Sequence, residues 1–174
     1  MAKNVTIITE GKFDAEALTE ILKDKNLGAE YKIISAGGYS SALSKARSLL
    51  SFGDQKVLLL LDTDSVEKDK IDEKKEFVDF YVSGKNNSEY FKAVWAIPEF
   101  EIIFLKNKKF LHQLRAEELS HELLEIGEAS PRRMLESISH EKRDSFLPLL
   151  NNKEVRDEFF KEGPVKEICD FMIS

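Results

Sequence analysis

The chain has 174 residues, of which 42% are hydrophobic and 33% are charged, and its formal net charge at pH 7 is −6. This length fits one domain, or one domain with a small appendage. The apolar content and twelve Phe residues exclude a disordered chain. The negative net charge argues against a protein whose whole surface grips DNA through its phosphates. It still allows a metal site next to a local strip of basic residues, which would attract the nucleic acid.

Cysteine content and hydropathy indicate in which cellular compartment we expect the protein. Cys169 is the only cysteine, so the chain has no internal disulfide and we expect no cysteine-based zinc site. The first nine residues leave no room for the apolar stretch of a signal peptide. No apolar run approaches the ~20 residues that a membrane span needs. We therefore expect a cytoplasmic protein with no membrane partner.

The first 61 residues alternate between predicted strands and helices. Short apolar runs predict strands at residues 5–9, 31–35 and 56–61. Between them, apolar residues at helical spacing predict helices at 14–22 and 40–50. Runs that are apolar throughout indicate strands covered on both faces.

The alternation continues to about residue 105. Residues 66–87 predict a charged helix followed by a loop, residues 91–97 a fourth strand, and residues 99–105 a helix after Pro98. Strands and helices that alternate with short connections predict a parallel sheet with helices on both faces. In such sheets functional residues gather at the carboxyl ends of the strands.

The rest of the chain predicts helices only. The helical stretches are residues 117–126, 130–139, 153–160 and 165–173. We therefore divide the chain into an α/β domain at residues 1–112 and a helical C-terminal extension at residues 113–174. The extension is either an appendage or a cap on the sheet.

Acidic residues follow three of the predicted strands. Glu10 follows the first strand, Asp62 and Asp64 the third, and Glu101 comes shortly after the fourth. Asp14 lies one helical turn beyond Glu10. Carboxylates that lie close together raise one another's pKa. We therefore expect a folded chain to gather several of them only where a cation is bound. Oxygen ligands without His or Cys suit Mg²⁺ or Mn²⁺, which can polarise a phosphodiester.

Each acid also has a structural interpretation. Asp62 or Asp64 can serve as a turn or cap residue, and Asp14 can be a helix cap. Glu99 is best explained as a first-turn acid favoured by the dipole of its own helix. Glu10 differs from the others, because a Glu before Gly11 is not needed for turning.

Two of these segments resemble the motifs of the Toprim family. TEGKFDAEAL, at residues 9–18, resembles its first motif, in which Glu-Gly follows a strand and an acid follows four residues after the Glu. LLLLDTDS, at residues 58–65, resembles its second motif, a strand followed by Asp-x-Asp. IPEFEIIFL, at residues 97–105, is similar to a segment of the overcoming-lysogenization-defect (OLD) nucleases, and Glu101 then matches their additional acid. The resemblance covers about residues 4–105.

The resemblance implies a Toprim fold, which is Rossmann-like, and a Mg²⁺- or Mn²⁺-dependent nuclease. Glu10, Asp62 and Asp64 would be catalytic, and with Asp14 and Glu101 they would be metal ligands in a two-metal arrangement. OLD proteins carry an ATPase domain that has no counterpart in this chain. Substrate selection is therefore expected to come from the C-terminal extension, a homodimer or a partner ATPase.

A further set of residues could contact phosphate or nucleic acid. The loop before the second helix can present backbone N–H groups to a phosphate, although a tight turn explains it better. Lysines near the expected active edge can contribute positive charge, although they also fit a solvated surface. The candidates are Gly11, Lys12, Gly37, Gly38, Lys85 and Lys106.

Three functions therefore stay open at this point. The chain is a Toprim nuclease acting on DNA or RNA, or a Toprim module that binds nucleic acid or a partner without cleaving. Alternatively, it is a receiver-like or nucleotide-binding α/β protein whose acids are incidental. The last alternative predicts that the carboxylate of Glu10 lies more than about 10 Å from those of Asp62 and Asp64, too far for one hydrated Mg²⁺ to join them.

Overall fold

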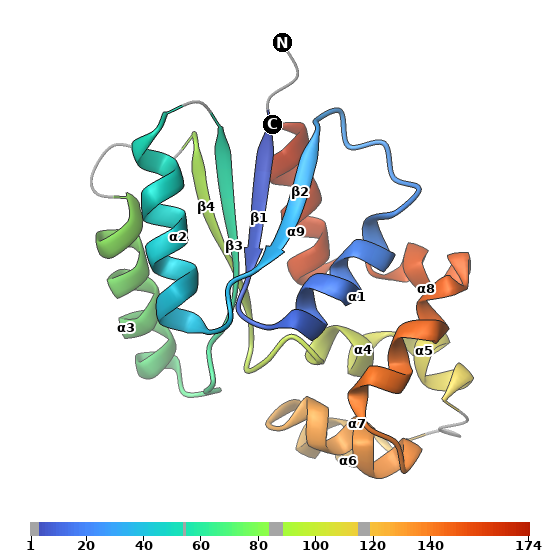
Figure 1. The fold of residues 1–174 in the computed structure, drawn as a ribbon. Coiled ribbons are helices and arrows are strands. Elements are labelled where there is room, and N and C mark those ends of the chain that lie inside the picture. Colours follow the sequence, from blue (N-terminus) through green and yellow to red (C-terminus); the bar gives the residue numbers. More distant parts are fainter. Residues whose placement is uncertain (1–3, 54, 84–88, 115–118) are drawn as a thin grey trace.

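A parallel β-sheet forms the centre of the protein. The computed structural model describes residues 4–53, 55–83, 89–114 and 119–174. The sheet has four strands in the order β2-β1-β3-β4, and all of them run parallel (Figure 1). The strands are β1 (Val5–Thr9), β2 (Tyr31–Ser35), β3 (Lys56–Asp62) and β4 (Phe91–Ala96). The predicted α/β class with a parallel four-stranded sheet is confirmed.

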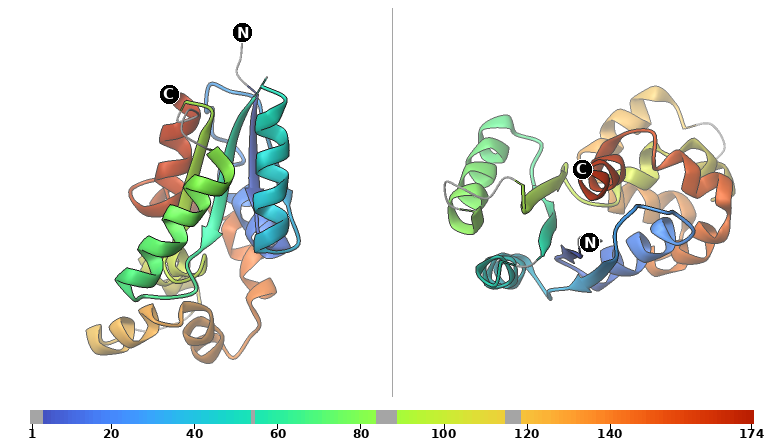
Figure 2. Two further views of the ribbon diagram at one scale, coloured as in Figure 1. Left: turned by 90° about the vertical axis from the view of Figure 1, so that its left-hand side faces the viewer. Right: turned by 90° about the horizontal axis from the view of Figure 1, so that it is seen from above.

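Helices cover both faces of this sheet, which explains why β1 is buried along its whole length and β3 up to Leu61. One face packs against α1 and α9, and the other against α2, α3 and the π-helical turn η1 (Figure 2). Successive residues of β1 point to opposite faces, so Ile7 joins one core and Ile8 the other. The bounds are α1 Lys12–Leu22, α2 Tyr39–Ser51, α3 Lys68–Val78, η1 Asp79–Ser83 and α9 Gly163–Ile173.

The remaining helices gather at and beyond the carboxyl ends of the strands (Figure 1). They are α4 (Ile102–Lys106), α5 (Lys108–Gln113), α6 (His121–Glu128), α7 (Pro131–Ser139), the 3₁₀ helix η3 (Arg143–Asn151) and α8 (Lys153–Glu158). The helix expected from residue 99 begins at Ile102, because residues 97–101 form the turn that leaves β4. The 3₁₀ helix was not predicted, because it contains Pro148 and lacks the α-helical period. The loop expected at residues 84–87 lies outside the described residues.

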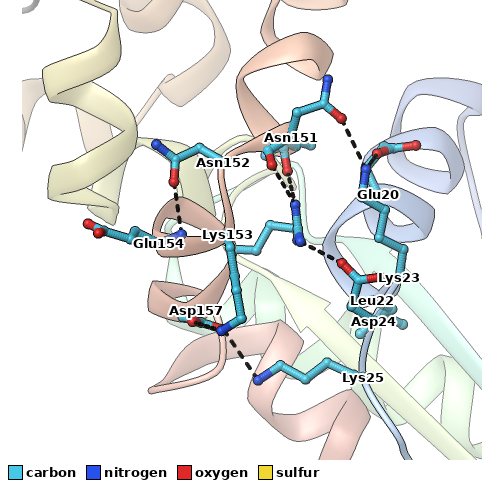
Figure 3. A network of polar contacts seen from close by, with 12 residues as sticks. Glu20, Leu22, Lys23, Asp24, Lys25, Asn151, Asn152, Lys153, Glu154 and Asp157 are labelled. Atoms are coloured by element: carbon cyan, nitrogen blue, oxygen red, sulfur yellow. Dashed lines mark hydrogen bonds and ion pairs between the residues drawn. The ribbon is translucent and has the colours of Figure 1, made fainter.

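The C-terminal extension packs onto the α/β domain. Leu135, Phe146 and Ile168 belong to the same buried cluster as Ile7 of the sheet. The end of α1 is also tied to η3 and α8 by polar contacts (Figure 3). Lys23 Nζ lies 3.0 Å from Asn151 Oδ1, Arg156 Nη2 lies 2.7 Å from Asp24 Oδ2, and Lys25 Nζ lies 3.5 Å from Asp157 Oδ1. The extension thus shares a buried core with the sheet, and its last helix, α9, covers one face of the sheet.

Within the described residues, no helix combines the length and apolar character that crossing a membrane requires.

Asn107 provides a test of how firmly the extension is attached. Its buried side chain accepts a hydrogen bond from Phe110 N at 2.9 Å, capping α5, and donates one to Val155 O of α8 at 2.9 Å. We expect N107A to lower the free energy of unfolding by about 2–3 kcal/mol, because it removes a helix cap and leaves a buried carbonyl unpaired. Urea unfolding measures this change.

The matched control is S120A, which removes an exposed helix cap only. Ser120 Oγ accepts a hydrogen bond from Leu123 N at 3.3 Å and, among the described residues, bonds to no other helix or strand. We expect S120A to cost about 1 kcal/mol or less. Equal losses in the two variants would show that the bond from Asn107 to α8 adds no stability.

Candidate functional site

The two motif acids, Glu10 and Asp62, meet because β1 and β3 are neighbours. The strands run parallel with Thr9 opposite Leu60, so both strands end at the same edge of the sheet. There Glu10 Oε1 accepts a hydrogen bond from the backbone N–H of Asp62 at 2.9 Å. The carboxylate of Glu10 therefore lies beside the end of β3, whereas the receiver-like alternative predicts that it lies far from the carboxylates that follow this strand.

Asp14 belongs to the same region and also holds the start of α1. The helix begins at Lys12, two residues earlier than expected, and Asp14 Oδ2 accepts from Gly11 N at 3.1 Å. A Cβ placed on Gly11 would lie 3.1 Å from the same oxygen, so a side chain there would crowd Asp14. Asp14 is therefore a buried carboxylate at the third position of α1 that binds the backbone of the N-cap residue, and that N-cap residue is Gly11 rather than Asp14 as the cap interpretation predicts.

Asp64 is held by a lysine that the sequence did not single out. Lys74 Nζ of α3 lies 2.6 Å from Asp64 Oδ2 and 2.8 Å from the backbone oxygen of Asp62. The ammonium also lies 4.6 Å from the centre of the Tyr39 ring. Asp64 adopts a left-handed backbone conformation with φ of 56°, which Asp and Asn tolerate better than most residues.

Glu101 is paired with an arginine from the C-terminal extension. The side chain of Glu101 is only 2% exposed, and its Oε1 lies 2.9 Å from Arg143 Nη1. The guanidinium carbon of Arg143 lies 4.9 Å from the centre of the Phe13 ring in α1. A buried carboxylate without such a partner would be costly, so this pair explains how Glu101 is accommodated.

Glu99 has a different role from the one expected. Its carboxylate accepts a hydrogen bond at 2.8 Å from the backbone N–H of Arg132, in the first turn of α7. Because α4 begins only at Ile102, Glu99 does not lie in the first turn of its own helix. The interpretation of Glu99 as a first-turn acid is wrong, and the carboxylate instead binds the start of a helix in the C-terminal extension.

The electrostatics of the site centre on Asp62. Burial, followed by the negative charges of Asp14, Glu10, Glu101 and Asp64, raises the pKa of the Asp62 carboxyl to about 8. Burial also raises the pKa values of Glu10 and Asp14, and Glu101 adds to the effect on Asp14. Within the described residues no group donates a hydrogen bond to the Asp62 carboxyl. A bound cation would therefore stabilise its charged form.

The five carboxylates suit a divalent ion chemically, but their arrangement is not that of a formed metal centre. Among the described residues, no three His, Cys, Asp or Glu side chains are placed so that they could hold one ion together. Asp64 and Glu101 are engaged by Lys74 and Arg143. Glu10, Asp14 and Asp62 have no ion pair in the part of the chain that the structure describes, and they would have to turn toward one another to share an ion.

The residues considered for phosphate contact are mostly engaged elsewhere. The N–H groups of Gly37 and Gly38 donate to the backbone oxygen of Glu10 at 3.0 and 2.9 Å, which supports the tight-turn interpretation of this loop. Lys12 is exposed and lies 3.3 Å from Glu16, and Lys106 lies 3.8 Å from Glu128. The N–H of Gly11 donates to Asp14. Lys85 lies outside the described residues.

Comparison with known proteins identifies no relative of this chain. No family model matches the chain, and no match emerges among curated proteins or solved structures. The Toprim resemblance therefore depends on the sequence motifs alone.

The raised pKa of Asp62 predicts an unusual pH dependence of stability. In the unfolded chain an Asp has a pKa near 3.9, whereas the folded value is about 8. The folded state therefore holds this proton more tightly, and its stability falls as the pH rises from about 4 to 8. We expect D62N to melt several degrees above the wild type at pH 8, because the Asn side chain carries no charge.

Thermal unfolding in EDTA at pH 4.5, 6 and 8 measures this effect. The gap between D62N and the wild type should grow with pH, whereas the exposed control D72N should follow the wild type throughout. A gap that is constant across this range would show that the Asp62 carboxyl titrates normally.

Proposed function

We propose that this chain is a divalent-metal-dependent enzyme that acts on nucleic-acid phosphodiesters, a nuclease of the Toprim type. The observation that carries the proposal is the hydrogen bond from the backbone of Asp62 to Glu10, two residues 52 positions apart. It joins the two motifs that resemble the family at one edge of a parallel sheet. That edge is where α/β sheets place their ligands.

Glu10, Asp14 and Asp62 would hold the ion once their side chains turn toward one another, because no three acidic side chains among the described residues are already placed to do so. A bound Mg²⁺ or Mn²⁺ would polarise a phosphodiester and stabilise charge on its oxygens. Burial raises the pKa of the Glu10 carboxyl above its ordinary value, and Glu10 is the residue proposed to exchange a proton as a general acid or base. Lys74 restrains Asp62 and Asp64 by bonding to both residues and so fixes the end of β3.

Nucleic acid is the proposed partner, as DNA or RNA, and the cytoplasm is the proposed location. The C-terminal extension, a homodimer or a partner ATPase would provide substrate selection. These parts of the proposal depend on the family resemblance alone.

Cleavage assays test the proposal directly. Plasmid DNA and structured RNA are incubated with purified protein in Mg²⁺, Mn²⁺ or EDTA. We expect metal-dependent cleavage that falls at least about 100-fold in E10Q and D62N, because each removes a metal-binding carboxylate. To test Asp64, the variant D64N is preferable to D64A. Asn tolerates the left-handed backbone conformation of residue 64, so D64N removes only the charge.

Two further measurements complete this test. D72N is the control for a lost surface carboxylate and should cleave like the wild type. Mg²⁺ should raise the melting temperature of the wild type but not of D62N, because an ion that binds only the folded state stabilises it. Cleavage that persists in EDTA or in D62N would contradict the proposed mechanism.

A second candidate function is a Toprim module that binds nucleic acid or a partner without cleaving. The observation that favours it is the engagement of Asp64 and Glu101 by protein cations, which leaves no three carboxylates placed for an ion among the described residues. This alternative predicts nucleic-acid binding that survives in EDTA, and no product with any divalent metal.

A further inference from the structure

The strand β4 forms an open edge of the sheet. Among the described residues it pairs with β3 alone, while α3 and α9 lie over its two faces (Figure 2). The backbone of alternate residues faces β3, as where Thr63 N donates to Ala96 O at 3.0 Å. The backbone groups of Ala93 and Trp95 therefore point away from β3, and within the described residues they make no hydrogen bond.

The features that commonly protect an open edge are weak in β4. Edge strands are often guarded by an exposed lysine or by a segment that covers them. The lysine of this strand, Lys92, is turned toward α9, where its Nζ lies 3.7 Å from Glu167 Oε2. Pro98 comes after the strand and does not interrupt it. A row of unpaired N–H and C=O groups fits one kind of partner, which is another extended backbone.

An exposed tyrosine stands at the amino end of this strand. Tyr90 is 45% exposed, and its backbone oxygen already belongs to the ladder, since it accepts from Val57 N at 2.7 Å. Alternation along the strand places its side chain on the same face as Val94 and Ala96. These two residues belong to the core that α9 covers, so Tyr90 projects from the α9 face of the edge.

A cavity of about 350 Å³ lies at the other, carboxyl end of β4. Trp95 and Ile97 line it from the strand, Ile102 from α4 and Pro164 from the start of α9. Charged side chains such as Lys161 complete the lining. This mixed lining suits a tyrosine, which combines an apolar ring with a hydroxyl group.

We propose that a second copy of this chain pairs with β4 in antiparallel orientation, about a two-fold axis at Ala93. In this register Ala93 faces its own counterpart and Trp95 faces Phe91 of the partner subunit. Tyr90 of the partner subunit lies opposite Ala96, between the two strand residues that line the cavity. Because a two-fold contact is reciprocal, each copy inserts its tyrosine into the cavity of the other.

Self-complementarity is the reason to choose a second copy over an unrelated strand. The strand carries both halves of the contact, a projecting aromatic ring at one end and a cavity at the other, and only antiparallel pairing brings them together. In the same register Lys92 lies opposite Val94 of the partner subunit, so the charge of the strand does not meet its own copy. The inference does not depend on the proposed function. It places the two candidate sites at opposite ends of one continuous sheet.

Sedimentation equilibrium tests this inference. At about 100 μM chain, well above the Kd of an interface of micromolar affinity, we expect a species of twice the chain mass of 19.9 kDa. Y90A should weaken the dimer at least about 10-fold, because it leaves the cavity empty. A93P should weaken it by at least as much, because it removes an N–H that faces the partner and none that faces β3.

The matched control for losing an exposed aromatic side chain is F52A. Phe52 is 73% exposed at the end of α2, a helix that packs on β1 and β3. F52A should dimerise like the wild type. Circular dichroism of A93P checks that the variant is folded.

A cysteine at the two-fold axis tests the register independently. Directly opposite residues of a hydrogen-bonded antiparallel pair have Cα atoms about 5.5 Å apart, within reach of a disulfide. A93C should therefore form a covalent dimer under mild oxidation. E89C, an exposed cysteine far from the axis, should not, and Cys169 is buried in both variants.

The outcomes decide the inference without touching the proposed function. A dimer that Y90A and A93P weaken and that A93C links would support it. A monomer would overturn it and leave the β4 edge to an extended segment of another protein. A dimer that both variants leave unchanged would also overturn it, because another surface would then hold the copies together. If A93P does not fold, the absence of a link in A93C would be decisive against it.

Discussion

The parallel pairing of β1 with β3 is the constraint on which the site depends. Neighbouring parallel strands end at the same edge of a sheet, so the register of these two brings Glu10 against the backbone of Asp62. Their carboxyl groups, together with Asp14, then repel one another in a partly buried place. The repulsion raises the pKa of the Asp62 carboxyl to about 8, and protein cations lie beside Asp64 and Glu101.

The C-terminal extension contributes to the buried core and also helps to neutralise the carboxylates of the site. It buries Phe146 and Ile168 in the cluster that covers the sheet, and it places Arg143 against Glu101. It also receives Glu99 at the start of α7. The extension therefore contributes both to the stability of the fold and to the charge balance of the site. Removing it would expose apolar surface and leave the buried carboxylate of Glu101 without its ion-pair partner.

The strands and the meeting of Glu10 with Asp62 could be predicted from the sequence, since both follow from local patterns and the rules of parallel sheets. Ion pairs across the fold could not. Lys74 lies on a helix with several other lysines, and nothing in the sequence distinguishes it. Arg143 is 42 residues from Glu101, and its position depends on a 3₁₀ helix that has no clear period. The partner of Glu99 depends on the same long-range packing.

The left-handed backbone at Asp64 has a consequence for any survey of sequence variation at this position. Most side chains with a Cβ are strained there, whereas Gly, Asn and Asp are not. A screen for correct folding alone would therefore retain those three residues, whether or not the carboxylate has a chemical task. Only the contrast between Asp and its uncharged isostere Asn separates conformational tolerance from chemistry at this corner of the chain.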